Sequence, residues 1–291
     1  MLYRFLFKTE IIAFIFIFLF ISLPVVEAQE RTFQLERFAY SSISLDISSD
    51  TENARATHWS PDGTLVFITG RFTENVVKYT VAEPWNLNTA EYSEEYDLSN
   101  EFGSINQLSR AHGFFIRGDG KKMWVFNRTE IWEYNLEQPW KLSSVHVNAY
   151  KDLSEFVQRG HDIDFTPDGS KIFIDDRNAQ AVHQAILTEP WEITSLVWTY
   201  SLDISDLEEE VRGIQFIQDG RIMLLLDTVR QEILQFDLSE PYDLKNAHFT
   251  TTFDLSEQVD NPRGLSISAD LTRIYITGNN RQRIYQYSLQ P

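Results

Sequence analysis

The sequence predicts an all-β protein built from five copies of one repeat, and two observations support this prediction. The first is a tripeptide, Asp-Leu/Ile-Ser, which is followed by a turn of the Pro-Asp-Gly type 16 residues later in four copies and 22 residues later in the second copy. The second is a proline that always precedes the next tripeptide by 13 residues. The tripeptide aspartates are Asp46, Asp97, Asp152, Asp203 and Asp254, the turn aspartates are Asp62, Asp119, Asp168, Asp219 and Asp270, and the prolines are Pro84, Pro139, Pro190, Pro241 and Pro291.

Each repeat is expected to contain four short antiparallel strands. Alternating apolar positions before each Asp-Gly turn, such as Ile163 and Phe165, indicate the first strand. A β-branched and aromatic run after the turn, such as 172–174, indicates the second, and a run such as 182–187 indicates the third. The fourth strand leads into the tripeptide. Because no part of residues 29–291 keeps a 3.6-residue period, helix is expected only in loops.

Four strands in a repeat of roughly 50 residues are typical of a β-propeller blade. The fifth repeat contains only three strands before Pro291, while residues 33–48 supply one additional strand that ends in the first Asp-Ile-Ser. Pairing this strand with the fifth repeat would close the ring and remove the free strand edges. The sequence therefore predicts a single five-bladed β-propeller of four-stranded antiparallel blades over residues 29–291, closed by the N-terminal strand.

The turn motifs also resemble a known group of proteins. Ser60-Pro61-Asp62-Gly63 and Thr166-Pro167-Asp168-Gly169 are each followed by an aromatic-centred strand and by Glu-Pro-Trp, as in secreted bacterial propeller repeats of the YVTN/NHL/lactonase-like kind. The resemblance covers the whole predicted domain and implies the propeller fold. It implies no single activity, because that superfamily includes lyases, lactonases, lectin-like binders and scaffolds. The second and fifth repeats depart from the motif at Gly118-Asp119-Gly120 and Ala269-Asp270-Leu271.

Residues 1–28 have the layout of a secretory signal peptide. Arg4 and Lys8 precede an apolar run over 11–23, and cleavage is expected after Ala28. The alternative is an uncleaved membrane anchor, for which the run is short compared with about 20 residues. We expect a secreted or periplasmic monomer with no membrane span after cleavage.

Composition excludes several classes of function. The sequence has no cysteine, so it has no disulfide, no thiolate metal site and no cysteine nucleophile. A net charge of −18 argues against nucleic-acid binding. No Gly-rich phosphate loop, GxSxG elbow or Rossmann fingerprint is present, and no cofactor is expected. The alternatives are a divalent metal on histidines and carboxylates near the channel, and calcium bound through Asp175, Asp176 and Asp227.

Two columns of the repeat are basic throughout, although the protein is acidic. One lies seven residues before each turn aspartate, at the start of the first strand, which lines the channel of a propeller. The other falls in the loops between the second and third strands, on the same face. The first column, the inner ring, is Arg55, His112, His161, Arg212 and Arg263, and the second, the outer ring, is Arg71, Arg128, Arg177, Arg230 and Arg281.

These columns give the candidate site. His58, Asp162 and Asp164 are expected to gather near the channel with His112 and His161, and His161-Asp162-Ile163-Asp164 places two carboxylates on one side of a strand. A six-residue insertion within 100–110 lies on the same face, where insertions often shape pockets. We assign ligand binding to both rings together with His58, Asp162 and Asp164.

Three interpretations of the site remain open. In the first, the propeller is not an enzyme and binds an anionic ligand, such as a glycan or a carboxylate, or a protein partner. In the second, it is a lyase or hydrolase of an anionic sugar or lactone, with His112 or His161 as general base and arginines neutralising a carboxylate. In the third, the protein is a scaffold in which the inner ring only pairs with the tripeptide aspartates. The Asp-Gly turns and the Pro-Trp corners are expected to be structural.

Overall fold

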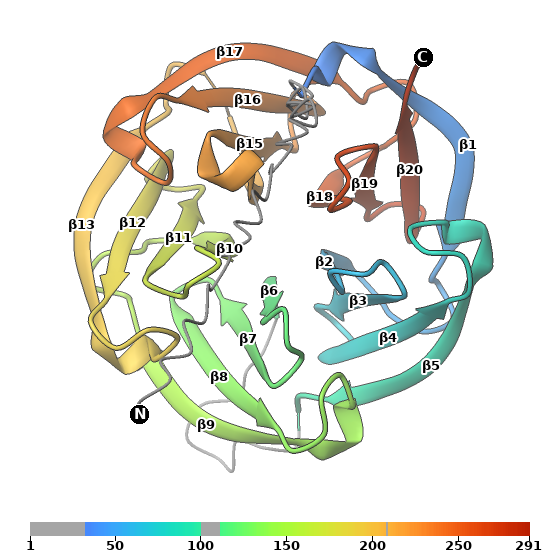
Figure 1. Ribbon diagram of the computed structural model, residues 1–291, viewed down its shortest axis with the longest axis horizontal. Helices are drawn as coiled ribbons and strands as arrows, with labels where there is room; N and C mark the ends of the chain where they lie inside the picture. Colours follow the sequence, from blue (N-terminus) through green and yellow to red (C-terminus); the bar gives the residue numbers. More distant parts are fainter. Residues whose placement is uncertain (1–32, 100–110, 208) are drawn as a thin grey trace, which may run out of the picture. The chain divides into compact units, whose positions relative to one another are not determined.

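The computed structural model describes residues 33–99, 111–207 and 209–291, of which 33–291 form one compact unit. Its strands build five four-stranded antiparallel sheets, which stand as blades in a ring (Figure 1). This confirms the predicted all-β, five-bladed propeller. The predicted signal peptide and the insertion of the second repeat lie outside the described residues. In the described part of the chain, no helix is long and apolar enough to cross a membrane.

Each blade runs from an inner strand at the channel to an outer strand at the rim (Figure 1). The first three blades are β2 (Ala54–Trp59), β3 (Leu65–Gly70), β4 (Asn75–Val81) and β5 (Ala90–Asp97); β6 (Gly113–Ile116), β7 (Lys122–Asn127), β8 (Glu130–Leu136) and β9 (Val145–Asp152); and β10 (Gly160–Phe165), β11 (Lys171–Asp176), β12 (Ala181–Leu187) and β13 (Leu196–Asp203). The last two are β14 (Val211–Ile217), β15 (Ile222–Asp227), β16 (Glu232–Leu238) and β17 (Ala247–Asp254); and β18 (Pro262–Ile267), β19 (Arg273–Gly278), β20 (Arg283–Leu289) and β1 (Phe38–Asp46).

Helix is confined to short 3-10 turns, as the sequence predicts. One precedes β1, one lies in the first turn of the fourth blade, and the other four connect the third and fourth strands of blades one to four. They are η1 (Leu35–Arg37), η2 (Leu87–Thr89), η3 (Leu142–Ser144), η4 (Ile193–Ser195), η5 (Gln218–Gly220) and η6 (Leu244–Asn246).

The ring closes where β1 pairs with β20. The pairing runs from Phe38 opposite Leu289 to Asp46 opposite Arg283, with one irregularity between Tyr40 and Ile43. The fifth blade therefore joins the two ends of the described unit, as predicted, and each inner strand contacts the inner strands on both sides of it. Closure at the rim leaves no blade incomplete, which removes an edge that could pair with another chain.

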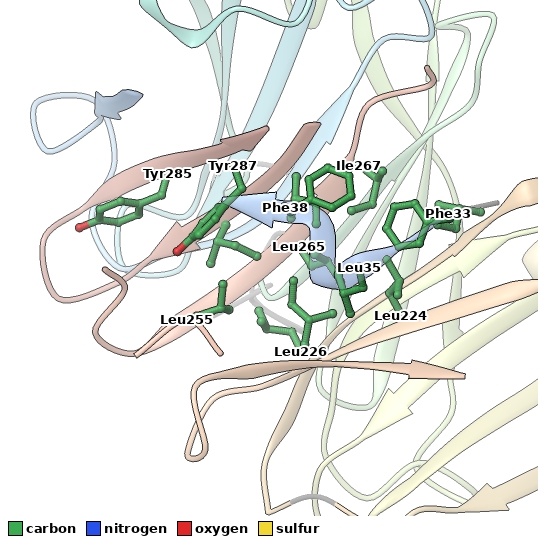
Figure 2. Packing of buried hydrophobic residues seen from close by; sticks show 14 of the residues in the cluster. Phe33, Leu35, Phe38, Leu224, Leu226, Leu255, Leu265, Ile267, Tyr285 and Tyr287 are labelled. Atoms are coloured by element: carbon green, nitrogen blue, oxygen red, sulfur yellow. The ribbon is translucent and has the colours of Figure 1, made fainter. Parts of the chain in front are cut away.

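The core is divided into five hydrophobic clusters, each made from the facing sides of neighbouring blades. Figure 2 shows the cluster between the fourth and fifth blades, where Leu224 and Leu226 of β15 meet Leu265 and Ile267 of β18. Phe33, Leu35 and Phe38, from the start of the described unit, complete this cluster. Burial between blades fixes their angle around the axis and so positions the inner strands that carry the candidate site.

The Pro-Trp corners pack against the Asp-Gly turns, which confirms their structural role. In the third blade the N–H of Trp191 donates to the carbonyl of Gly169 at 3.0 Å, and the indole ring covers that glycine. Gly169 has φ +71°, and a Cβ there would lie 2.2 Å from a ring atom of Trp191. The fifth turn has Leu271 in place of this glycine. Glycine is thus required both by the left-handed backbone and by the ring above it.

We expect Gly169→Ala to lower the free energy of unfolding by at least about 2 kcal/mol, because it combines a left-handed alanine with a steric clash. Urea unfolding measures the effect. Gly118→Ala is the matched control, since a Cβ at Gly118 would make only an ordinary contact, 3.5 Å from Pro61. Equal stability of the two variants would contradict this account of the corner.

Candidate functional site

The inner ring lies at one mouth of the channel, where the inner strands begin. Its members stand at or next to the first residues of β2, β6, β10, β14 and β18, which are neighbours around the axis. His112 and His161 are only 2% and 3% exposed, and Arg55 and Arg212 only 4% and 7%; Arg263 is half-buried. In four repeats the residue after the inner-ring member is glycine or alanine, because neighbouring inner strands approach each other closely at that position. A Cβ on Gly264, for example, would lie 2.3 Å from the carbonyl oxygen of Arg55.

The two histidines lie against each other and against Arg212. Their rings meet edge to face with centroids 4.7 Å apart, and Nη1 of Arg212 lies 3.0 Å from Nε2 of His161. Arg212 can only donate, so Nε2 accepts and His161 is a neutral imidazole. Burial, together with the charges of nearby arginines, lowers the pKa of both histidines well below the usual value.

Arg212 is neutralised by a neighbour, but Arg55 and Arg263 are not. Glu210 accepts from Nε and Nη2 of Arg212, at 3.1 and 2.5 Å. Arg55 donates from Nη2 to the neutral side chain of Asn53. In the described part of the chain, the buried Nε and Nη1 atoms of both Arg55 and Arg263 have no hydrogen-bond partner.

Like charges crowd this mouth. Burial, reinforced by the charges of Arg263, Arg212 and other arginines, lowers the pKa of Arg55 to about 8. Burial and a similar set of neighbours lower the pKa of Arg263 to about 9. A guanidinium remains protonated at neutral pH in proteins. The two groups therefore carry positive charge at a buried mouth, and no ion pair with a described residue offsets it.

The outer ring divides into two parts. Arg71 and Arg128 act on Arg55, and Arg177 acts on His161, as the charges that lower the pKa values of those groups. Arg177 also forms an ion pair with Glu210, the carboxylate that binds Arg212. Arg230 and Arg281 are exposed and face acidic residues at the rim: Arg230 lies 3.7 Å from Glu209, and Arg281 lies 3.4 Å from Asp260.

Arg159 joins the basic mouth and was not predicted. Its charge lowers the pKa values of His161, Arg212 and Arg263. It stands two residues before the inner ring, a position that holds Asn53, Glu210 and Asn261 in three other repeats and Arg110 in the second. The sequence signal was an extra arginine beside a basic column, which the column comparison passed over because that position is not basic in every repeat.

The tripeptide aspartates do not pair with the inner-ring arginines as the scaffold interpretation requires. Each of the five accepts a hydrogen bond from the N–H of the serine two residues later, at 2.8 to 3.0 Å. Asp46 also pairs with Arg283 at 2.9 Å. The partners of Arg55 and Arg212 are Asn53 and Glu210 instead. The tripeptide is a local turn motif, so its fixed distance from the inner ring reflects the length of the repeat.

His58, Asp162 and Asp164 are not brought into this mouth. They line a separate cavity further along the channel, toward the Asp-Gly turns, and none of the arginines lines it. Asp164 accepts hydrogen bonds from the backbone N–H groups of Phe165 and Phe216, at 2.8 and 2.7 Å. The inner edge of each blade is a free strand edge, and a carboxyl group here satisfies N–H groups of two neighbouring inner strands.

Burial shifts the pKa values in this second group. It raises the pKa of Asp162 well above the usual value, helped by the charge of Asp175, and raises those of Asp164 and Asp175 to about 7. Burial also lowers the pKa of His58 to about 4. All of these groups therefore tend toward their neutral forms.

Asp164 gives a pH-dependence that can be tested. Its folded-state pKa, about 7, exceeds its unfolded value, 3.8, so between these values the unfolded chain is ionised while the folded chain holds the proton. The Asp164 contribution to stability is therefore largest below pH 4 and falls as pH rises toward 7. We expect the unfolding free energy of Asp164→Asn, relative to wild type, to rise by roughly 2–4 kcal/mol from pH 4 to 7.5. Urea titrations at several pH values measure it, and a difference independent of pH would contradict it.

The aspartates suggested as calcium ligands accept hydrogen bonds from backbone N–H groups. Asp175 accepts from the N–H groups of His161 and Asp162, at 2.7 and 2.8 Å. Asp176 and Asp227 accept N–H groups of the inter-blade loops in the same way. Among the described residues, no cluster of three or more histidine, aspartate or glutamate side chains is arranged to hold a metal ion.

Fold and site together define a β-propeller with a buried, basic channel mouth. No protein-family model matches the sequence, and no curated protein matches it. Solved structures do match. A protein of unknown function from Desulfotomaculum acetoxidans has a TM-score of 0.48 and 14% identity, over 78% of this chain and 63% of that one. A putative 6-phosphogluconolactonase from Bacteroides uniformis has a TM-score of 0.49 and 11% identity, over 78% and 64%.

A third match is the periplasmic gluconolactonase of Pseudomonas aeruginosa, with a TM-score of 0.47 and 13% identity, over 80% of this chain and 65% of that one. The present chain thus spans less than two thirds of the length of each of these three proteins. At these identities the likeness concerns the fold alone.

Proposed function

We propose that this propeller binds a small, compact anionic ligand at the inner-ring mouth. One observation carries the proposal: the guanidinium groups of Arg55 and Arg263 are buried next to each other's charge, with Nε and Nη1 atoms that have no partner in the described part of the chain. A carboxylate or phosphate presents the paired oxygens that fit two such donors. It would also reduce the repulsion among the arginines of the mouth.

The rim of the same face supports a compact ligand over an extended polyanion. Among the residues that the structure describes, the inter-blade loops around the mouth carry six exposed acidic side chains: Glu52, Glu155, Asp206, Glu209, Glu257 and Asp260. A long sulfated or uronate chain lying across the face would run over these carboxylates. A small mono- or dianion instead sits within the positive field of the mouth and avoids the negative rim.

Isothermal titration calorimetry with citrate, inorganic phosphate and dextran sulfate tests this proposal. We expect citrate or phosphate to bind at one site, and dextran sulfate to bind more weakly per chain than either. Binding of dextran sulfate alone would contradict the proposal that the ligand is compact. Binding of none of the three would contradict anion binding itself. Charge reversal in Arg263→Glu is expected to remove the signal.

A second function is favoured by His112. Neither of its ring nitrogens has a partner among the described residues, whereas Nε2 of His161 receives Arg212. With its lowered pKa, the imidazole of His112 is neutral at pH 7 and able to accept a proton. The alternative function is therefore a lyase or hydrolase of an anionic sugar or lactone, with His112 as general base. An assay with sugar lactones and uronate oligosaccharides tests it: His112→Ala should lower the rate by about 10²–10⁴-fold, and an unchanged rate would count against it.

Residues 1–28 support a location outside the cytoplasm. Their basic start, apolar run and Ala28 form the layout of a cleaved secretory signal. We propose that the mature protein begins at Gln29 and works in the periplasm or outside the cell. N-terminal sequencing of protein exported by a bacterial host tests this: a chain that starts at Met1 would contradict it.

A further inference from the structure

A second binding region lies inside the channel, on the side of the Asp-Gly turns. It is a cavity of about 200 Å³ lined by residues of all five inner strands. At about 30 Å³ for each molecule of liquid water, such a volume corresponds to roughly six waters, which is room for a small organic molecule. Its walls combine aromatic rings, including Phe114 and Phe115, with a few polar groups.

Two carboxyl groups dominate the polar wall. Asp162 and Asp164 stand two residues apart on β10 and therefore point to the same side of the strand. Each accepts two backbone N–H groups, Asp162 at 3.0 and 3.4 Å and Asp164 at 2.8 and 2.7 Å, so each carboxylate retains further acceptor capacity. Among the described residues that line the cavity there is no lysine or arginine.

Two further polar groups face the cavity without a partner. Ser266, which is 5% exposed, has a hydroxyl group that makes no hydrogen bond in the described part of the chain. The indole N–H of Trp59, also 5% exposed, likewise makes no hydrogen bond to a described residue. Both residues line the cavity. Buried polar groups are ordinarily satisfied, so these two indicate a polar molecule inside it.

We propose that this cavity binds a small organic cation, with an ammonium group between the side chains of Asp162 and Asp164, which release their protons to solvent as the cation binds, and a carbon body against the aromatic wall. An ammonium supplies three donors to carboxylates that lack a cationic partner, and aromatic faces attract cations. An anion is disfavoured because it would oppose the ionisation of the same two groups. The proposal is independent of the anion site, because the cavity shares no lining residue with either basic ring.

Benzylammonium chloride and the neutral, similarly shaped benzyl alcohol are the probes. Isothermal titration calorimetry at constant ionic strength should show benzylammonium binding at one site, at least tenfold more tightly than benzyl alcohol. Equal affinities, or no binding of benzylammonium, would overturn the proposal. In Asp164→Asn we expect the preference for the cation to fall at least tenfold.

Ala269 allows a test that leaves the carboxylates in place. It is exposed and stands at the rim of the cavity, so Ala269→Trp places bulk at the entrance without altering the inner strands. We expect this variant to fold and to lose benzylammonium binding, while Ala269→Ser keeps it. Undiminished binding to Ala269→Trp would show that the cation associates with the acidic surface, and would overturn the assignment to this cavity.

Discussion

Replacing Arg55 and Arg263 together by glutamine is expected to weaken binding of the small anion by about 100-fold or more. A hydrogen bond to a charged group contributes about 1.5–3 kcal/mol, and the double variant removes at least two of them. The same substitution is expected to raise the unfolding free energy of the ligand-free protein. Burial and neighbouring guanidinium groups lower the pKa of Arg55 to about 8, which means that the fold holds this charge at a cost.

These opposite effects on binding and on stability distinguish a ligand site from a structural cluster. Titration calorimetry with citrate measures the first and urea unfolding the second. Arg283→Gln is the control, because Arg283 pairs with Asp46 on the outer strand at 2.9 Å, far along the blade from the mouth. A double variant that loses stability and binds citrate as well as wild type does would show that the ring is structural.

Glu133→Ala is expected to lower the unfolding free energy by about 3–5 kcal/mol, because it leaves two buried N–H donors without their acceptor. Glu133 is fully buried on β8. It accepts from Nζ of Lys122 at 2.7 Å and from the backbone N–H of Ile193, in the next blade, at 3.3 Å. Its loss leaves the backbone N–H of Ile193 and the indole N–H of Trp124 without their acceptor at the blade interface, while Lys122 keeps its ion pair with Glu192 at 2.6 Å.

Glu133→Gln is the matched variant and should cost clearly less. Glutamine occupies the equivalent position in the three later blades, and in two of them it makes the same contact: Oε1 of Gln184 accepts from the N–H of Leu244 at 3.1 Å, and Oε1 of Gln286 from that of Leu87 at 3.2 Å. Urea unfolding of the two variants compares them. If alanine and glutamine destabilise equally, the inter-blade hydrogen bond contributes nothing.

The fold follows from the sequence because the repeat encodes it several times over. Each turn aspartate, corner proline and alternating strand recurs at fixed spacing, so local signals agree with one another and with ring closure. The corner contact explains why the turn glycine recurs in the first four repeats: Gly63, Gly120, Gly169 and Gly220 are each covered by the aromatic ring of their own corner.

The site was predictable only in part. Column comparison located the inner ring, because identical positions in successive blades must meet around the axis. It placed Asp162 and Asp164 near the channel but did not show at which end, because residues of one inner strand are spread along the channel and reach different ends of it. It also passed over the position of Glu133, where the blades use lysine, glutamate and glutamine for related inter-blade contacts. The net charge of the whole chain, −18, gives no sign of the basic inner ring.

The anion site is the central claim, and thermal unfolding in phosphate tests it most directly. The midpoint of unfolding is compared in millimolar phosphate and in sodium chloride of equal ionic strength, for wild type and for the variant with Arg55→Gln and Arg263→Gln. A ligand that binds only the folded state raises its stability. We predict a higher midpoint in phosphate for wild type and no difference for the variant. Equal midpoints in the two salts for wild type, or an equal rise in both proteins, would contradict the claim.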